Sequence, residues 1–134
     1  DLHVRTHELG DWIEAAVKEY GLAPESLVAV GYSNGANIAA NLLLQRPGLV
    51  RRAALLRVML LPSPIPAPDL KGTSVLISSG VADQLLPLAD AEKLAENLEG
   101  FGAQVTFQRQ PTDHRLISAD LETVQNWLSE TQPA

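Results

Sequence analysis

Two apolar segments joined by a short turn place the strongest constraint on what this chain can fold into. Residues 27–30 are short and continuously apolar, as in a strand that is buried on both faces of a sheet. Residues 36–44 are almost wholly apolar and long enough to form a helix, which must then be buried too. A central strand and a buried helix both need covering layers, so the sequence predicts a layered α/β domain.

The other apolar patterns alternate between helix and strand. Further helices are predicted where apolar residues recur with a helical period, over residues 9–20, 91–98 and 118–128. Further strands are predicted where short apolar runs lie between turn residues, over residues 53–61, 74–79 and 105–107. The resulting order is helix, strand, helix, strand, strand, helix, strand, helix. This order is typical of a parallel sheet with helices on both faces, so we expect one three-layer sandwich domain over residues 1–134.

Two of these helices have an amphipathic pattern that predicts which side faces the core. The apolar stripe of the first helix consists of Leu9, Trp12, Ile13, Ala16, Val17 and Tyr20. In the last helix, Ser118 is expected to cap the N-terminus, with Asp120 and Glu122 in the first turn. The inner face of that helix is predicted to be Leu121, Val124 and Leu128.

Composition and charge exclude several classes of protein. The 134 residues include no cysteine, so disulfides, thiolate metal sites and thiol nucleophiles are excluded. The net charge of −6 repels phosphate backbones, which makes nucleic acid an unexpected partner. No apolar stretch reaches the roughly 20 residues of a membrane-spanning helix. These features are typical of a soluble domain, and we expect a cytoplasmic location.

The turn between the two buried segments reads Gly31-Tyr32-Ser33-Asn34-Gly35. A serine on so sharp a strand-to-helix turn brings the neighbouring backbone close, so glycine is expected two residues to either side. The hydroxyl then stands clear of the sheet at a helix N-terminus, where backbone N–H groups stabilise developing negative charge. Ser33 is therefore a candidate nucleophile. The alternative is a tight turn that contains a serine by chance.

A serine nucleophile needs a base, and three histidines are available. His114 follows the last predicted strand, in a loop that can overhang the carboxyl edge of the sheet, and it is the predicted base. His3 and His7 lie four residues apart on the first helix, a spacing that could hold a metal. They lack the glutamate and third ligand of a typical zinc motif, so a solvated helix face is the favoured interpretation. We expect no metal and no cofactor.

The third member of such a site is a carboxylate between the serine and the histidine in the chain, which orients the imidazole. Asp83 follows the predicted strand at residues 74–79 and therefore lies at the same edge of the sheet. Asp90 is expected in the first turn of a helix, and Asp69 lies in a proline-rich connection. Asp113 is too near His114 in sequence to orient it. Asp83 is the predicted acid, with an ordinary turn aspartate as the alternative.

At this point the chain resembles a known family. The segments GYSNGANIAA, GVADQLLPLADAEKL and GAQVTF, followed by a histidine and a terminal helix, resemble the phospholipase/carboxylesterase branch of the α/β-hydrolase superfamily. The resemblance covers nearly the whole chain. It implies that Ser33, Asp83 and His114 are nucleophile, acid and base, that the Asn34 backbone N–H is an oxyanion donor, and that the substrate is a small-molecule ester.

Two departures from the family pattern bear on function. The residue before the histidine is usually glycine in the family, whereas here it is Asp113, which we expect to influence the charge of the histidine or to crowd its loop. Relatives also begin with strands that carry a His-Gly and glycine-rich stretch, the source of a second oxyanion donor. No such stretch precedes Ser33, so the chain resembles the C-terminal two-thirds of such an enzyme.

Two functions are compatible with these features. The first is a serine hydrolase that cleaves carboxylic esters through an acyl-enzyme on Ser33. The second is an interaction or oligomerisation module, a hydrolase remnant whose exposed sheet edge pairs with another chain. Without its family partner, the strand at residues 27–30 would lie at the edge of the sheet with unpaired backbone groups. We therefore expect a homo-oligomer, with a two-fold dimer as the favoured form.

Overall fold

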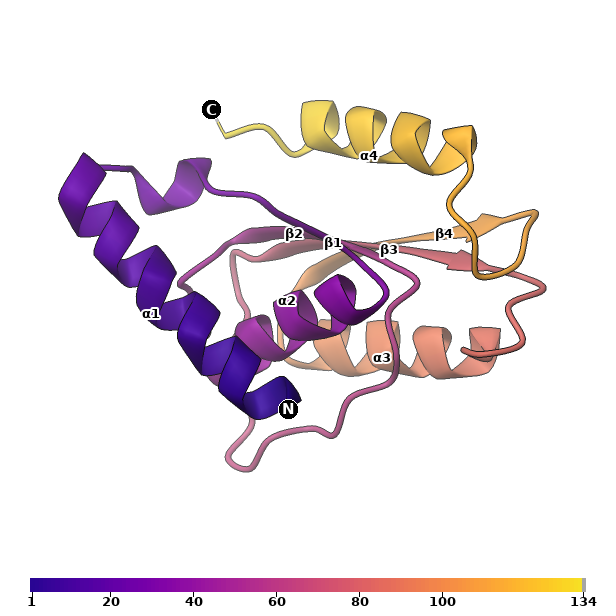
Figure 1. The fold of residues 1–134 in the computed structure, drawn as a ribbon, viewed down its shortest axis with the longest axis horizontal. Coiled ribbons are helices and arrows are strands. Elements are labelled where there is room, and N and C mark those ends of the chain that lie inside the picture. The colour runs from indigo at the N-terminus through magenta and orange to yellow at the C-terminus, as the bar shows by residue number, and fades with distance from the viewer. Residues whose placement is uncertain (134) are drawn as a thin grey trace.

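Four parallel strands form the centre of the computed structural model, which describes residues 1–133 (Figure 1). The elements in chain order are α1 (Leu2–Tyr20), the 3₁₀ turn η1 (Pro24–Ser26), β1 (Ala29–Tyr32), α2 (Asn34–Gln45), β2 (Arg52–Leu56), β3 (Ser74–Gly80), α3 (Leu88–Gly100), β4 (Gln104–Gln110) and α4 (Ser118–Glu130). The predicted order of helices and strands is confirmed. Among residues 1–133, no helix has the length and apolar content needed to cross a membrane.

The strands lie in the sheet in the same order as in the chain, β1-β2-β3-β4, and every neighbouring pair is parallel. The register pairs Gly31 of β1 with Leu55 of β2, and Leu55 with Ile77 of β3. β2 and β3 occupy the centre of the sheet, and their side chains are nearly all buried. Since parallel strands end at the same edge, the loops after all four strands meet there.

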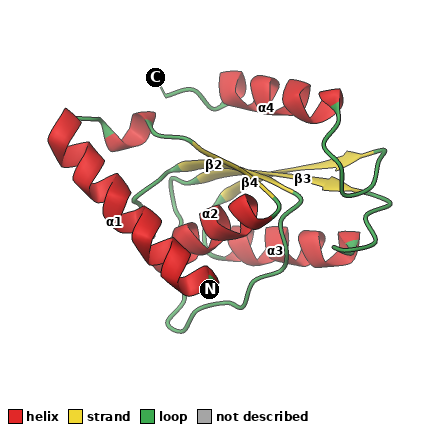
Figure 2. Cartoon of the chain, in the orientation of Figure 1, coloured by secondary structure: helices red, strands yellow, loops and turns green. Residues whose placement is uncertain are grey.

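Helices cover both faces of the sheet, which confirms the predicted three-layer arrangement (Figure 2). On one face, α2 and α3 bury the larger apolar core, which includes Leu43, Leu94, Leu55 and Ile77. On the other face, α4 buries a smaller cluster around Leu76, in which Val124 and Trp127 take part. α1 lies outside this sandwich and packs on α2.

β1 is an edge strand with only β2 as a neighbour, as expected for a chain that resembles the C-terminal part of the family fold. It begins at Ala29 rather than residue 27. Burial on both faces is not found, because Val30 is 56% exposed and Tyr32 is exposed as well. The reason is that α2 covers one side of β1, while α4 lies over β3 and β4 and leaves the other side open.

β2 ends at Leu56, five residues before the predicted end of the strand at residue 61. Arg57 has a φ of 57°, in the left-handed region that interrupts an extended strand. Its backbone N–H still donates to the carbonyl of Ser78 on β3 (3.0 Å). The apolar character of residues 58–61 reflects packing rather than strand, since Val58 and Leu61 are buried in the core.

Part of the apolar stripe predicted for α1 is exposed. The helix begins at Leu2, so His3 and His7 lie on it as predicted. Within the stripe, Trp12 is 68% exposed and Tyr20 is exposed as well, whereas the other four residues are half-buried. The buried residues are Thr6 and Gly10. The Thr6 hydroxyl accepts a hydrogen bond from the Asn41 side chain of α2 (2.9 Å), and a Cβ on Gly10 would overlap the side chain of Arg46, the residue that follows α2. α1 therefore packs on α2 with Thr6 and Gly10 at its buried positions, while Leu2 packs against the apolar core.

The predicted start and inner face of α4 also need correction. Ser118 is the first helical residue rather than the cap, and Ile117 occupies the cap position. Asp120 lies in the first turn as predicted; it is buried, and its carboxylate accepts the N–H of Ile117 (2.9 Å). Leu121 is 60% exposed, whereas Val124 is buried as predicted.

A pair of leucine variants tests this assignment of faces. Leu76→Ala removes a fully buried side chain from β3, so we expect the free energy of unfolding in urea to fall by about 2–5 kcal/mol. Leu121→Ala makes the same chemical change at an exposed helical position and should cost less than about 0.5 kcal/mol. Equal losses in the two variants would contradict the exposed position of Leu121.

Candidate active site

The turn that carries Ser33 is held by contacts of the backbone. A Cβ on Gly31 would lie 2.5 Å from the carbonyl carbon of Gly35, so only glycine fits at the end of β1. A Cβ on Gly35 would meet no atom within 4 Å, which corrects the expectation that both glycines avoid a clash. The Ser33 N–H donates to the carbonyl of Leu56 on β2 (2.8 Å). Ser33 itself has a φ of 55°, the strained conformation of a residue presented on a sharp turn.

The structure brings Ser33, His114 and Asp83 together although they are far apart in the chain. The Ser33 Oγ lies 3.0 Å from Nε2 of His114. The other ring nitrogen of His114, Nδ1, lies 2.7 Å from Oδ2 of Asp83. The Asp83 side chain is 2% exposed and that of His114 is 23% exposed. A hydroxyl, an imidazole and a buried carboxylate thus form one continuous hydrogen-bonded chain.

The Asp83 carboxylate is oriented by its own turn. Oδ1 accepts the backbone N–H groups of Leu85 (2.8 Å) and Leu86 (2.9 Å), which leaves Oδ2 for His114. Burial of the carboxylate acts to raise the pKa of Asp83, but the hydrogen bonds from His114, Leu86 and Leu85 outweigh it, so the pKa is lowered. Asp83 therefore stays ionised at neutral pH and holds a fixed orientation toward the imidazole.

The loop that carries His114 packs closely on the ends of the strands. A Cβ on Gly80, the last residue of β3, would overlap the carbonyl oxygens of Asp113 and Thr112. The Thr112 carbonyl also accepts the N–H of Ala82 (3.0 Å). Because no side chain intervenes at Gly80, the loop rests directly on the backbone of β3.

Asp113, the residue that departs from the family pattern, has a partner of its own. Its carboxylate accepts the backbone N–H of Arg115 (2.9 Å) and a guanidinium N–H of the same residue (3.1 Å). These hydrogen bonds lower the pKa of Asp113. The carboxylate that contacts the His114 ring is that of Asp83.

The other acidic and histidine candidates lie elsewhere. Asp90 is in the first turn of α3, as predicted, and Asp69 accepts the backbone N–H of Lys71 in a turn (3.0 Å). His3 and His7 face each other on α1, with their Nε2 atoms 3.0 Å apart. Within residues 1–133, no group of three or more His, Asp or Glu side chains is arranged to hold a metal ion.

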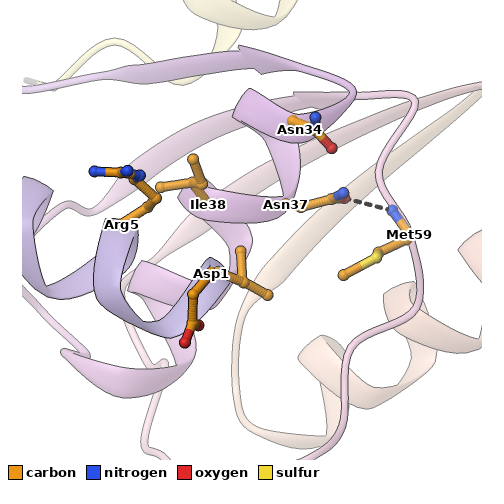
Figure 3. Close-up of a pocket in the computed structure, with 7 residues that line it drawn as sticks. Asp1, Arg5, Asn34, Asn37, Ile38 and Met59 are labelled. Atoms are coloured by element: carbon orange, nitrogen blue, oxygen red, sulfur yellow. Dashed lines mark hydrogen bonds between the residues drawn. The ribbon is translucent and has the colours of Figure 1, made fainter.

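A hollow of about 310 Å³ lies beside the start of α2 (Figure 3). Asn34 is the first residue of this helix, so its backbone N–H has no acceptor within the helix. The Asn37 side chain accepts the N–H of Met59 (2.9 Å), which fixes one wall of the hollow. Ile38 and Leu2 contribute apolar surface. The hollow is at the lower end of the volumes of small-ligand pockets.

A second hollow, of about 490 Å³, adjoins the histidine. It is lined by Ala82, Gln84, Leu85, Asp113, His114 and Arg115. The two hollows share no lining residue: the first includes Asn34, which follows Ser33 in the chain, and the second includes His114.

Comparison with known proteins identifies the family of this chain. Residues 3–132 match the family described as Phospholipase/Carboxylesterase. The chain belongs to this family. Phospholipase/Carboxylesterase members are hydrolases of the α/β type, and the four-stranded parallel sheet with its helices matches a part of their fold.

Relatives within the Phospholipase/Carboxylesterase family are longer than this chain. The protein MhqD of Bacillus subtilis (strain 168) is 36% identical over 130 residues, which are 97% of this chain and 65% of MhqD. The Bacillus cereus carboxylesterase is 35% identical with a TM-score of 0.91, over 98% of this chain and 62% of that one. The Mesorhizobium loti carboxylesterase is also 35% identical, with a TM-score of 0.88 and the same two coverages. The chain thus spans less than two thirds of the length of these relatives.

Two residues of the site were not singled out from the sequence. The Tyr32 hydroxyl donates to the carbonyl of His114 (3.0 Å), and the two rings are tilted toward each other with centroids 5.6 Å apart. Gly80 receives the histidine loop on its backbone. The available signal for close approach was a glycine directly after the strand predicted at residues 74–79, whereas Tyr32 had no local signal because its partner is far away in the chain.

A glycine pair tests how closely the histidine loop rests on β3. Gly80→Ala adds a Cβ where the carbonyls of Asp113 and Thr112 lie, so we expect a loss of about 1–3 kcal/mol in the free energy of unfolding. Gly100→Ala at the end of α3 adds the same atom in open space at a helical position, so it should not lower stability and is expected to raise it by up to about 1 kcal/mol. Urea denaturation of both variants measures the difference. If Gly80→Ala had the same free energy of unfolding as the wild type, the close contact between the histidine loop and β3 would be contradicted.

Proposed function

We propose that this chain is a serine hydrolase that cleaves carboxylic esters through an acyl-enzyme on Ser33. The observation that carries the proposal is the continuous contact from the Ser33 Oγ through both ring nitrogens of His114 to the buried Asp83 carboxylate. Nucleophile, base and orienting carboxylate are the parts that acyl transfer through serine needs. Membership of the Phospholipase/Carboxylesterase family supports ester substrates.

The proposed reaction has two halves. Nε2 of His114 takes the proton of Ser33 as Oγ attacks the ester carbonyl, and the resulting oxyanion faces the N–H of Asn34. The imidazolium then gives its proton to the alcohol oxygen, which leaves as the acyl-enzyme forms. In the second half, His114 takes a proton from water as the water attacks the acyl-enzyme. The imidazolium then returns this proton to the Ser33 Oγ, and the carboxylic acid leaves as the second product. Asp83 accepts a hydrogen bond from the Nδ1–H of the imidazole throughout and stabilises the positive charge of the imidazolium.

The oxyanion donors set the expected speed of this reaction. Asn34 supplies one backbone N–H at the start of α2. Losing one donor of an oxyanion hole costs about 2.7–4 kcal/mol, or roughly a hundred- to a thousandfold in turnover. Turnover by a chain with only this donor would therefore be slow, and covalent labelling of the serine is the more sensitive test. As part of the proposal, we place the reaction in the cytoplasm and without a cofactor.

Labelling by a fluorophosphonate tests the nucleophile. The reagent needs an activated serine, so we expect one covalent adduct on the wild-type chain and none on Ser33→Ala. The substitution removes one Oγ and should leave the fold intact, which circular dichroism can check. Equal labelling of both proteins would rule out Ser33 as the nucleophile.

Two aspartate variants extend this test to the acid. Asp83→Asn takes away the acceptor that fixes the tautomer of His114, so the labelling rate should fall by orders of magnitude. Asp113→Asn is the matched control, because it changes the adjacent residue, whose carboxylate binds Arg115. A larger loss in Asp113→Asn than in Asp83→Asn would show that the acid is assigned incorrectly.

A second candidate function is self-association through β1. This strand is at the edge of the sheet, and Val30 presents apolar surface there. An unpaired apolar edge is a template for a further strand, and a second copy of the chain could extend the sheet across a two-fold axis. The chain could associate in this way whether or not Ser33 is catalytically active.

Light scattering at micromolar concentration tests the dimer. We expect twice the mass of one chain for the wild type, and the mass of one chain for Val30→Lys, because two like charges would meet across the axis. Thr106→Lys is the matched control, since it places the same charge at an exposed position on β4, at the opposite edge. A monomeric wild type would rule out self-association at this concentration.

A further inference from the structure

The position of His114 poses a structural problem. Its loop follows β4 at one edge of the sheet, yet the imidazole contacts Ser33, which follows β1 at the other edge. Three spacings between neighbouring strands separate these edges, which is roughly 14 Å. The loop must therefore cross the ends of β3 and β2 and stay in place over them.

The residue at the end of β2 lies beneath this crossing. Arg57 is fully buried, and all five of its side-chain N–H donors have acceptors. Nε donates to the carbonyl of Asp113 (3.1 Å), and Nη2 donates to the carbonyl of Arg115 (2.7 Å). These are the two residues on either side of His114. The remaining donors go to the Ser78 carbonyl (3.1 Å) and to both oxygens of Asp120 (2.9 Å each).

Asp120 fixes the guanidinium from the opposite side. Its carboxylate also accepts the Ser78 hydroxyl (2.8 Å) and the Ile117 N–H (2.9 Å), so it is saturated with donors. Burial acts to raise the pKa of Asp120, but the hydrogen bonds from Arg57, Ile117 and Ser78 outweigh it and lower the pKa. A planar guanidinium that is paired in this two-pronged way has one orientation, and its other donors therefore point in fixed directions.

We propose that Arg57 is a positioning residue for His114, an inference that rests on the proposed function of the site. It holds the carbonyls before and after the histidine, while Tyr32 holds the carbonyl of the histidine itself (3.0 Å). Three successive carbonyls of the loop are thus bound by side chains from the ends of β1 and β2. Arg57 acts through this backbone to keep the imidazole between Ser33 and Asp83.

A purely structural role is the competing explanation, and Arg52 provides the comparison. It is a second buried arginine, at the start of β2, and it donates to the Leu128 carbonyl (2.7 Å) and the Thr131 hydroxyl (3.2 Å) at the far end of α4. Loss of Arg52 weakens the attachment of α4 to the sheet without touching the histidine loop. A residue that only ties α4 to the sheet would behave like Arg52.

The test separates stability from geometry. Arg57→Met combined with Asp120→Leu removes both partners of the buried pair, so neither charge is left alone and the fold is expected to persist. Arg57→Lys is a second variant, which keeps a positive charge for Asp120 but cannot donate to both loop carbonyls in the fork geometry. Arg52→Met is the control. For each folded protein we would measure the fluorophosphonate labelling rate and the nitrogen NMR shifts of the His114 ring, with His3→Gln and His7→Gln to assign the other rings.

The expected result is a labelling rate about a hundredfold lower in the double variant and in Arg57→Lys, as for an approximately 1 Å misplacement of a reacting group. The His114 ring should lose its single Nδ1-protonated tautomer in both. Arg52→Met should unfold at lower urea concentration but keep the labelling rate and the His114 spectrum of the wild type. The proposal would be overturned if the double variant or Arg57→Lys kept the labelling rate and the His114 spectrum of the wild type. It would also be overturned if Arg52→Met changed the labelling rate and the His114 spectrum as much as the Arg57 variants do.

This experiment also distinguishes the failure of the two proposals. If the wild-type chain does not react with the fluorophosphonate, the proposed function fails, and the His114 spectrum alone decides the role of Arg57. A change of tautomer in the Arg57 variants then supports the positioning role, and an unchanged spectrum contradicts it.

Discussion

The common direction of the four strands is the constraint on which the other features of this molecule depend. It places the ends of β1 to β4 at one edge of the sheet, and each end contributes one part of the site or its support. Ser33 follows β1, Arg57 follows β2, Asp83 follows β3 and His114 follows β4. Parallel strands provide proximity in this way, but they do not set angles between side chains. The angles come from the backbone contacts of the turns and from buried hydrogen bonds.

The element order and the three site residues could be predicted from the sequence because their signals are local. In β3 a short apolar run at residues 75–77 lies close to turn residues, and the Gly31-to-Gly35 turn between a strand and a helix is a local pattern. Asp83 and His114 were found because each follows a predicted strand, and the ends of parallel strands meet. The roles of Ser33, Asp83 and His114 in a reaction remain predictions.

The features that were predicted incorrectly depend on distant neighbours. Whether Val30 is buried depends on which helix lies over β1, and whether Trp12 is buried depends on where α1 docks. The spacing of apolar residues along a single strand or helix does not determine either of these contacts. Arg57 gave a partial signal, since a charge inside an apolar run must be paired, but nothing nearby identified its partner. Asp120 looked like an ordinary residue of a first helical turn and is instead the buried half of that pair.

The left-handed backbone of Arg57 has a consequence for attempts to stabilise this protein. A φ of 57° costs a residue with a Cβ about 1–2 kcal/mol, a cost that glycine does not carry. A design procedure that scores positions by backbone conformation would therefore choose glycine here. That choice would leave a buried carboxylate without its cation and two loop carbonyls without donors. Backbone preference and side-chain requirement are in conflict at this residue, so engineering of the chain should keep it fixed. The same conflict exists at Ser33, the other non-glycine residue with a positive φ among those described, where the hydroxyl is the group to be kept.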